Sequence, residues 1–194
     1  MDITDKSLIE ANNSGQSWAF EQLVRRYGPS LLGYLIKICG SREKAEDYFQ
    51  QTFMKVFENA KNFRGGSFKS WLFRIGTNVV MDGFRREKVR SHFSIDGFAA
   101  QDDCEGENAS VSKIEENSAN PSDCAAKAES ILLVRRLINL LPERQRVTLV
   151  LNYYEQLTFT EVANIMNCSV GTVKRQMYRA MKTLAVKLPD RGLL

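Results

Sequence analysis

The chain has 194 residues, of which 43% are hydrophobic, enough for a folded core in one domain or in two small ones. No run approaches the roughly 20 apolar residues of a membrane span, and the N-terminus lacks a basic segment followed by an apolar one, so we expect a cytoplasmic protein without membrane insertion. Four widely spaced cysteines and a single histidine, His92, favour reduced thiols and indicate neither a metal nor another cofactor.

Charge divides the sequence into three blocks. Residues 1–90 carry a net charge of +5, residues 91–126 of −7 and residues 127–194 of +6. Two basic modules joined by an acidic segment indicate two separate contacts with a polyanion. The acidic block is rich in polar residues and has no sustained apolar period, which predicts a flexible linker. Its charge suits a positively charged channel on a partner, and a simple soluble tether is an equally good interpretation.

Helical periodicity dominates the first module. Apolar residues recur every three and four positions over 20–38, with Gly28-Pro29 as an expected kink, and again over 45–57. Gly40-Ser41 separates these two helices. After the turn-prone stretch Phe63-Arg64-Gly65-Gly66, Ser67 is expected to cap a third helix.

The exposed face of that third helix is basic. Its stripe consists of Arg74, Asn78, Asp82 and Arg85, which are followed by Arg86, Lys88 and Arg90. A polyanion is the expected partner of this ridge, and Asp82 is expected to form an ion pair with Arg85. Trp71 is a possible stacking platform, but its spacing places it on the apolar stripe and favours core packing.

The second module carries the signature of a helix-turn-helix. Thr158 and Glu161 form a capping box at the start of one short helix, and Leu157 and Val162 are placed to act as a hydrophobic staple. Ser169 is the expected N-cap of a second helix with one apolar and one basic face. Such a helix fits the major groove of DNA, whereas a merely solvated basic face is the alternative.

No alternation of apolar and polar residues persists long enough for a strand, so the sequence predicts an all-α protein. We expect two small helical domains, at 1–92 and 128–194, joined by a flexible acidic linker at 93–127. The order of the predicted helices, the acidic linker and the helix-turn-helix resembles that of bacterial sigma factors of the extracytoplasmic-function (ECF) group. The motifs that carry the resemblance are Ala45-Glu46-Asp47-Tyr48-Phe49-Gln50-Gln51-Thr52-Phe53, Phe63-Arg64-Gly65, Ser70-Trp71-Leu72-Phe73-Arg74-Ile75, Leu141-Pro142-Glu143-Arg144-Gln145-Arg146 and Val170-Gly171-Thr172-Val173-Lys174.

The resemblance implies that the first module is sigma region 2. In this family its second helix docks on the clamp coiled coil of the largest subunit of core RNA polymerase, and Asp47, Gln50, Gln51 and Phe53 occupy the core-binding motif. Gln51 departs from the more usual glutamate, which removes one charge from the docking face.

The third helix would engage the −10 promoter element, where the duplex opens and a base leaves the stack. The residues implied are Arg64, Gly65, Ser67, Arg74, Asn78, Asp82, Arg85 and Arg86. Asn78 offers a donor and an acceptor to a base edge, and the two C-terminal arginines can hold the backbone. The segment Phe63 to Phe68 is expected to line the pocket for the extruded base.

The second module resembles sigma region 4, which reads the −35 element as duplex DNA. The residues implied are Ser169, Gly171, Thr172, Lys174, Arg175, Tyr178 and Arg179. Phosphate contacts are expected for Lys174 and Arg179, since such contacts position a protein without reading sequence. Arg144 and Arg146 are assigned to phosphate, to the flap of the second-largest polymerase subunit or simply to solvent.

The implied partners are core RNA polymerase, promoter DNA and an anti-sigma factor. A stand-alone helix-turn-helix regulator is the alternative, but it would need a ligand-sensing or dimerising first module, and that module carries a nucleic-acid ridge of its own. An enzyme is disfavoured because the sequence shows no nucleophile paired with a base, no phosphate-binding glycine loop and no metal-ligand cluster.

Overall fold

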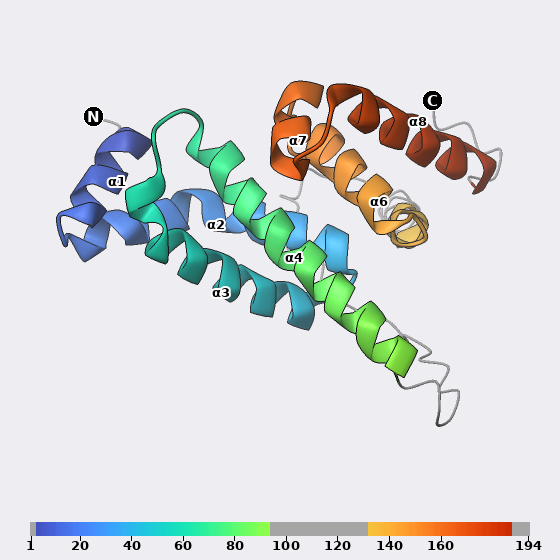
Figure 1. The fold of residues 1–194 in the computed structure, drawn as a ribbon, viewed down its shortest axis with the longest axis horizontal. Coiled ribbons are helices and arrows are strands. Elements are labelled where there is room, and N and C mark those ends of the chain that lie inside the picture. The colour runs from blue at the N-terminus through green and yellow to red at the C-terminus, as the bar shows by residue number, and fades with distance from the viewer. Residues whose placement is uncertain (1–2, 94–131, 188–194) are drawn as a thin grey trace, which may run out of the picture.

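The computed structural model describes residues 3–93 and 132–187, and every regular element in these two ranges is helical (Figure 1). The first module contains α1 (Asp5–Asn13), α2 (Ser17–Cys39), α3 (Arg42–Glu58), the 3₁₀ turn η1 (Ala60–Asn62) and α4 (Phe68–Phe93). The second contains a helical stretch at 132–139, α6 (Glu143–Leu149), the π-helical segment η3 (Val150–Tyr154), α7 (Phe159–Met166) and α8 (Val170–Lys187). The all-α prediction is therefore confirmed for these ranges. The predicted linker lies outside the described residues from residue 94 onward.

Helix α2 is the centre of the first module and packs against α1, α3 and α4. Several of its apolar side chains, Leu23, Leu31 and Leu35 among them, are completely buried. The buried hydroxyl of Tyr34 shares a hydrogen bond of 2.7 Å with the hydroxyl of Thr77 on α4, so its polar atom is satisfied. The helix continues through Pro29, where the sequence predicted a kink.

The N-terminal helix α1 was not predicted. The Thr4 hydroxyl accepts from the backbone N–H of Ser7 at 3.2 Å and caps the helix. Leu8 and Ile9 are buried, and α1 packs against both α2 and η1. Two adjacent apolar residues give too weak a helical period to be noticed in the sequence.

Side-chain caps set the helix starts that the sequence predicted. The Ser41 hydroxyl accepts from the N–H of Lys44 at the start of α3, and the Ser67 hydroxyl accepts from the N–H of Ser70 at the start of α4. Gly40, between α2 and α3, has a φ of 70°, a left-handed conformation that favours glycine at a helix C-terminus.

The helix-turn-helix of the second module is also confirmed. The Thr158 N–H donates to the Glu161 carboxylate at 2.8 Å, and the Glu161 N–H donates to the Thr158 hydroxyl at 3.3 Å, which is the complete capping box. Helix α7 ends at Asn167 in the left-handed conformation, with a φ of 49°. The Ser169 hydroxyl then accepts from the N–H of Thr172 at 3.1 Å and caps α8.

The two modules pack directly against each other, with α7 against α4 and η3 against α2 (Figure 1). Glu155 of the second module lies in this contact, and its side chain is 8% exposed. Its carboxylate accepts from the Ser30 hydroxyl at 2.6 Å and lies 3.4 Å from the Lys69 ammonium, which also donates to the backbone carbonyl of Glu155 at 3.0 Å. We call these three residues the Glu155 latch.

Arg146 also joins the modules, and the prediction that it faces DNA phosphate, the polymerase flap or solvent is wrong. Its guanidinium donates to three backbone carbonyls, those of Ile38 at 2.6 Å, Asn139 at 2.7 Å and Leu141 at 3.1 Å. Burial lowers the pKa of this arginine from its ordinary value. The side chain is a structural tie between the end of α2 and the turn before α6, whereas Arg144 is exposed as expected.

Candidate nucleic-acid interface

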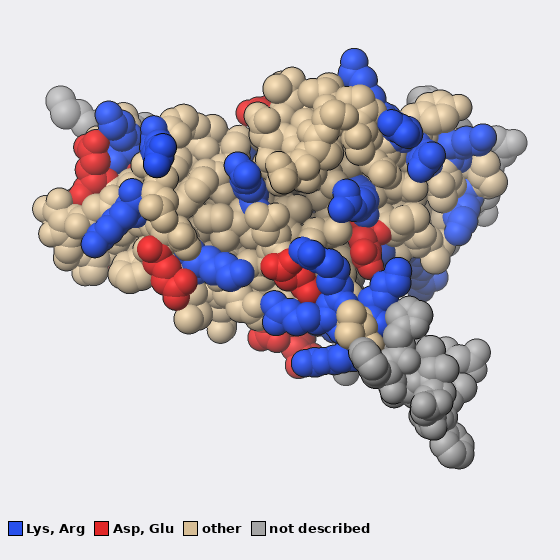
Figure 2. Space-filling model, viewed as in Figure 1, with Lys and Arg blue, Asp and Glu red and all other residues tan. Residues whose placement is uncertain are grey.

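The basic ridge of α4 is present on the surface. Arg74, Asn78, Arg85 and Arg86 are exposed and Asp82 is partly exposed, and Asp82 forms the expected ion pair with Arg85. Figure 2 shows lysine and arginine side chains gathered toward the C-terminal end of α4 and along α8. A row of exposed cations is the arrangement that attracts a nucleic-acid backbone.

The loop before α4 is built for an unusual backbone path. Gly65 and Gly66 have φ angles of 93° and 87°, in the region that favours glycine. A Cβ at either position would meet nothing within 4 Å, so the glycines are needed for conformation and not for space. Arg64 and Ser67 are exposed on either side of them, although the hydroxyl of Ser67 is engaged in capping α4.

A small open pocket of about 280 Å³ lies beside the ridge, between α3, η1 and α4. Its lining consists of Lys55, Asn59, Asn62, Trp71, Ile75 and Asn78. Three carboxamides offer donors and acceptors of the kind that base edges present, and the indole offers a flat apolar wall. The segment Phe63 to Phe68, which the sequence predicted to line the pocket for the extruded base, contributes no residue to this cavity, and its role stays a prediction.

The turn after α3 fixes two of these amides. The Asn59 side chain donates to the Lys55 carbonyl at 2.8 Å, and the Asn62 side chain donates to the Asn59 amide oxygen at 3.2 Å. Sequence reasoning missed both asparagines and Lys55. The sequence signal that could have identified the two asparagines is their spacing of three residues in a short turn that follows a helix.

Trp71 lies partly in the core and partly in the pocket. Its ring packs against Phe63 at a centroid distance of 5.3 Å and against Phe68 at 5.7 Å, as core packing predicts. It is nevertheless only partly buried and forms part of the pocket wall. Core packing of Trp71 is therefore confirmed in part, and its role as a stacking platform stays a prediction.

On α8 the predicted reading residues divide into two groups. Ser169 and Thr172 bond to each other at 2.9 Å within the helix cap, and Gly171 lies between them. The second group lies on the exposed surface and consists of Lys174, Arg175, Tyr178 and Arg179. Tyr178 is the most open of the helix-turn-helix aromatics, at 68% exposure, and can stack or donate a hydrogen bond.

Helix α3 offers a third surface, of mixed polarity. Asp47, Gln50 and Gln51 are exposed on it, while Phe53 is 6% exposed and packs in the core at 4.9 Å from the Phe49 ring. Phe53 therefore supports this face from below. Large apolar side chains reach solvent farther along the helix, where Met54 and Phe57 are exposed although the sequence placed Phe57 on the apolar stripe. Exposed apolar groups next to polar ones are typical of a protein-binding surface.

Within the described residues no three histidine, cysteine, aspartate or glutamate side chains are grouped to hold a metal ion, and no helix is long and apolar enough to cross a bilayer. Cys39 and Cys168, the two cysteines in the described ranges, are free thiols. Burial raises the pKa of the Cys39 thiol to about 12.

Two family models match the chain. Sigma-70 region 2 matches residues 23–90, and Sigma-70 region 4 matches residues 131–184. The chain is 30% identical to the RNA polymerase sigma-H factor of Pseudomonas aeruginosa, over 93% of this chain and 91% of that protein. It is 30% identical to the ECF RNA polymerase sigma-E factor of Haemophilus influenzae over 96% of each.

Solved structures agree with these matches. The sigma factor RpoE in complex with the anti-sigma factor NepR, from Bartonella quintana, aligns with a TM-score of 0.66 at 25% identity, over 89% of this chain and 98% of that chain. CnrH in complex with the cytosolic domain of CnrY aligns with a TM-score of 0.64 at 23% identity, over 94% and 95% of the two chains, a likeness of fold alone.

Proposed function

Because this chain belongs to the ECF group of bacterial RNA polymerase sigma factors, we propose a role for each of its three exposed surfaces in transcription initiation. Sigma factors are initiation factors without an enzymatic activity of their own: they bind core RNA polymerase and direct it to promoters. The stand-alone regulator is not favoured, since the match over 23–90 gives the first module a sigma role. We infer that the protein acts in the cytoplasm, where the polymerase and the chromosome are.

The pocket beside α4 is the proposed site for an extruded base of the −10 element. The observation that carries this role is the meeting of three amides and an indole beside a row of arginines. The amide of Asn78 would bond to the base edge, and the indole of Trp71 would stack on its face. Arg74, Arg85 and Arg86 would hold the phosphates of the opened strand, with Arg64, Gly65 and Ser67 at the entrance.

The exposed face of α8 is the proposed reader of the −35 element. Its N-terminal turns would enter the major groove, because the helix start is where a recognition helix meets base edges. Arg175 and Tyr178 would contact bases, while Lys174 and Arg179 would contact phosphates. Ser169, Gly171 and Thr172 would bring the helix start close to the backbone.

Core polymerase is the proposed partner of the α3 surface. Asp47, Gln50 and Gln51 would bond to the clamp of the largest subunit, and Phe53 would keep their helix in place. The second module would meet the flap of the second-largest subunit. An anti-sigma factor that covers these surfaces would hold the protein inactive, and the structure of RpoE in complex with the anti-sigma factor NepR supports such a partner.

Transcription in vitro with sigma-free core polymerase and a library of genomic upstream fragments tests the assignment. Asn78→Ala should lower promoter opening, measured as permanganate reactivity of unpaired thymines, by about tenfold, the value of one lost base contact. Binding to core polymerase should not change. Asn13→Ala, which removes an exposed amide of α1, is the control. Loss of polymerase binding by Asn78→Ala, or unchanged promoter opening, would contradict the role.

A further inference from the structure

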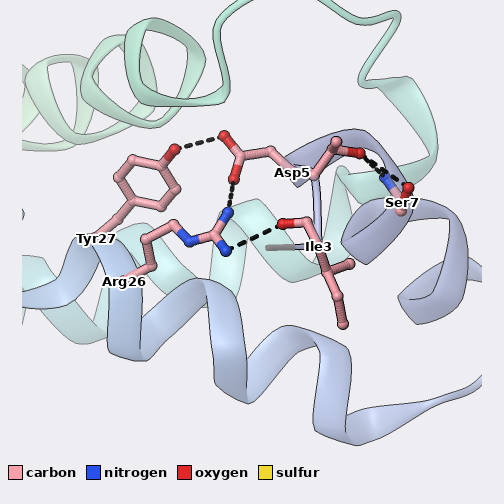
Figure 3. A network of polar contacts seen from close by, with 6 residues as sticks. Ile3, Asp5, Ser7, Arg26 and Tyr27 are labelled. Atoms are coloured by element: carbon pink, nitrogen blue, oxygen red, sulfur yellow. Dashed lines mark hydrogen bonds and ion pairs between the residues drawn. The ribbon is translucent and has the colours of Figure 1, made fainter. Parts of the chain in front are cut away.

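A compact polar network joins the N-terminal segment to α2 (Figure 3). The Asp5 carboxylate accepts from the Arg26 guanidinium at 2.6 Å through one oxygen and from the Tyr27 hydroxyl at 2.5 Å through the other. Arg26 also donates to the backbone carbonyl of Ile3 at 3.0 Å. Both carboxylate oxygens are thus used, and the hydroxyl of Tyr27 has a fixed partner.

The chemistry of Tyr27 keeps this contact in place. Burial, reinforced by the hydrogen bond to Asp5, raises the pKa of Tyr27 to about 12. The hydroxyl is therefore protonated at neutral pH and donates to the carboxylate. A charge-assisted hydrogen bond of this kind is short and directional, so it restrains the ring.

The restrained ring is the first member of an aromatic chain. Tyr27 packs against Phe68 at a centroid distance of 5.1 Å, and Phe68 is fully buried. Phe68 contacts Phe63 at 5.8 Å and Trp71 at 5.7 Å, and these two contact each other at 5.3 Å. Phe63 and Phe68 bracket the glycine loop, and Trp71 is a wall of the pocket.

A second contact leads from the same network to the opposite wall. Helix α1, whose first residue is Asp5, packs against η1. Asn62 ends η1 and Asn59 precedes it, and both line the pocket. The N-terminal segment therefore supports the indole side through Tyr27 and the amide side through α1.

We propose that Asp5 and Tyr27 are positioning residues for the −10 pocket: they fix the aromatic chain that ends at Trp71, so that the indole is held where an extruded base can stack on it. The inference rests on the proposed role of the pocket. Neither residue touches DNA in this scheme: Tyr27 acts through Phe68, and Asp5 acts through Tyr27 and through α1. Pre-organised side chains of this kind are what a site needs to bind without reordering.

Trp71 itself reports on this support. In a Trp18→Phe background, Trp71 is the sole tryptophan of the chain. Tyr27→Phe keeps the ring and removes the hydroxyl, and Asp5→Ala removes the acceptor. Both should raise the acrylamide quenching constant of Trp71 about twofold, because the indole becomes mobile at the pocket surface. Asp5→Asn retains one of the two acceptor oxygens, so its quenching constant should lie between those of wild type and Asp5→Ala. Glu10→Gln, which removes an α1 ion pair to Lys6, should change nothing.

The functional arm measures binding of fluorescein-labelled single-stranded oligonucleotides that carry the −10 sequence recovered from the transcription library. The Tyr27→Phe and Asp5→Ala holoenzymes should bind about fivefold more weakly than wild type, the effect of one hydrogen bond, with core-polymerase binding unchanged. Equal quenching in all variants, well below their unfolding temperatures, would overturn the proposal. If quenching rises while strand binding stays at the wild-type value, the positioning role is likewise wrong. If the wild-type holoenzyme itself does not bind the single-stranded oligonucleotide, the proposed function of the pocket is wrong. The quenching result then still decides whether Asp5 and Tyr27 position Trp71.

Discussion

Removing the carboxylate of the Glu155 latch should separate the two modules. In Glu155→Ala, the Ser30 hydroxyl loses an acceptor at 2.6 Å and the Lys69 ammonium loses an ion pair at 3.4 Å. Truncating one partner of a fully buried pair costs about 3–5 kcal/mol, but Lys69 is 33% exposed and regains water, so we expect about 2 kcal/mol. This free energy corresponds to roughly a 30-fold rise in the ratio of open to closed molecules.

Small-angle X-ray scattering of the full chain measures this opening as an increase in the radius of gyration. Glu155→Gln keeps a hydrogen-bonding side chain without the charge and should open less than Glu155→Ala. Glu21→Ala removes an exposed carboxylate that pairs with Arg25 on α2, and it should scatter like wild type. Circular dichroism checks that each variant stays helical. An unchanged radius for Glu155→Ala would refute the reasoning, because the contact between modules would then not depend on this carboxylate.

Three further outcomes follow from the described contacts. Thr158→Ala should cost about 1 kcal/mol of unfolding free energy at neutral pH. The backbone N–H of Thr158 and then its hydroxyl lower the pKa of Glu161 from 4.5, and the alanine keeps the first bond and loses the second. The hydroxyl's share of the stabilisation is present above pH 4.5 and is lost as pH falls through the lower folded pKa, so chemical denaturation should show a partly smaller difference between the two proteins in acid. Cys39, with its pKa raised to about 12, should alkylate with iodoacetamide at least about tenfold more slowly than free cysteine at pH 8, as peptide mass spectrometry would record. Gly83→Ala should destabilise the first module by about 1–3 kcal/mol, since the new methyl would overlap the Tyr48 hydroxyl, and Tyr48→Phe should recover part of the lost denaturation midpoint.

Local features of the fold could be predicted because their causes are local. The capping box at Thr158, the cap at Ser67 and the Asp82–Arg85 ion pair each join residues three apart in the sequence. The helical period likewise identifies α2, α3 and α8, since their apolar residues recur every three or four positions over several consecutive turns. The same reasoning placed the exposed ridge of α4 correctly.

Features that depend on packing between distant segments could not be predicted from the sequence. The pocket brings Asn59 and Asn62 to Asn78 from separate elements, and no spacing rule joins them. Arg146 belongs to a basic module and so was assigned to DNA, the flap or solvent, yet carbonyl groups of two chain segments converge on it. The sequence predicted no role for Glu155, because its partners, Ser30 and Lys69, belong to the other module and lie far away in the sequence.

The direct contact between the two modules also limits how much promoter DNA a molecule with a closed Glu155 latch can contact. Because α4 packs on α7 and α7 on α8, two helix spacings of about 10 Å each place α8 within roughly 20 Å of the N-terminal half of α4. Elements centred about 25 base pairs apart lie roughly 85 Å apart along B-form DNA, at 3.4 Å per base pair. With the proposed roles of α4 and α8, a closed molecule would therefore engage one element at a time, without the avidity of about 10²- to 10⁴-fold that linked binding provides. With the roles proposed for α4 and α8, both modules would bind a single promoter together only after the Glu155 latch opens.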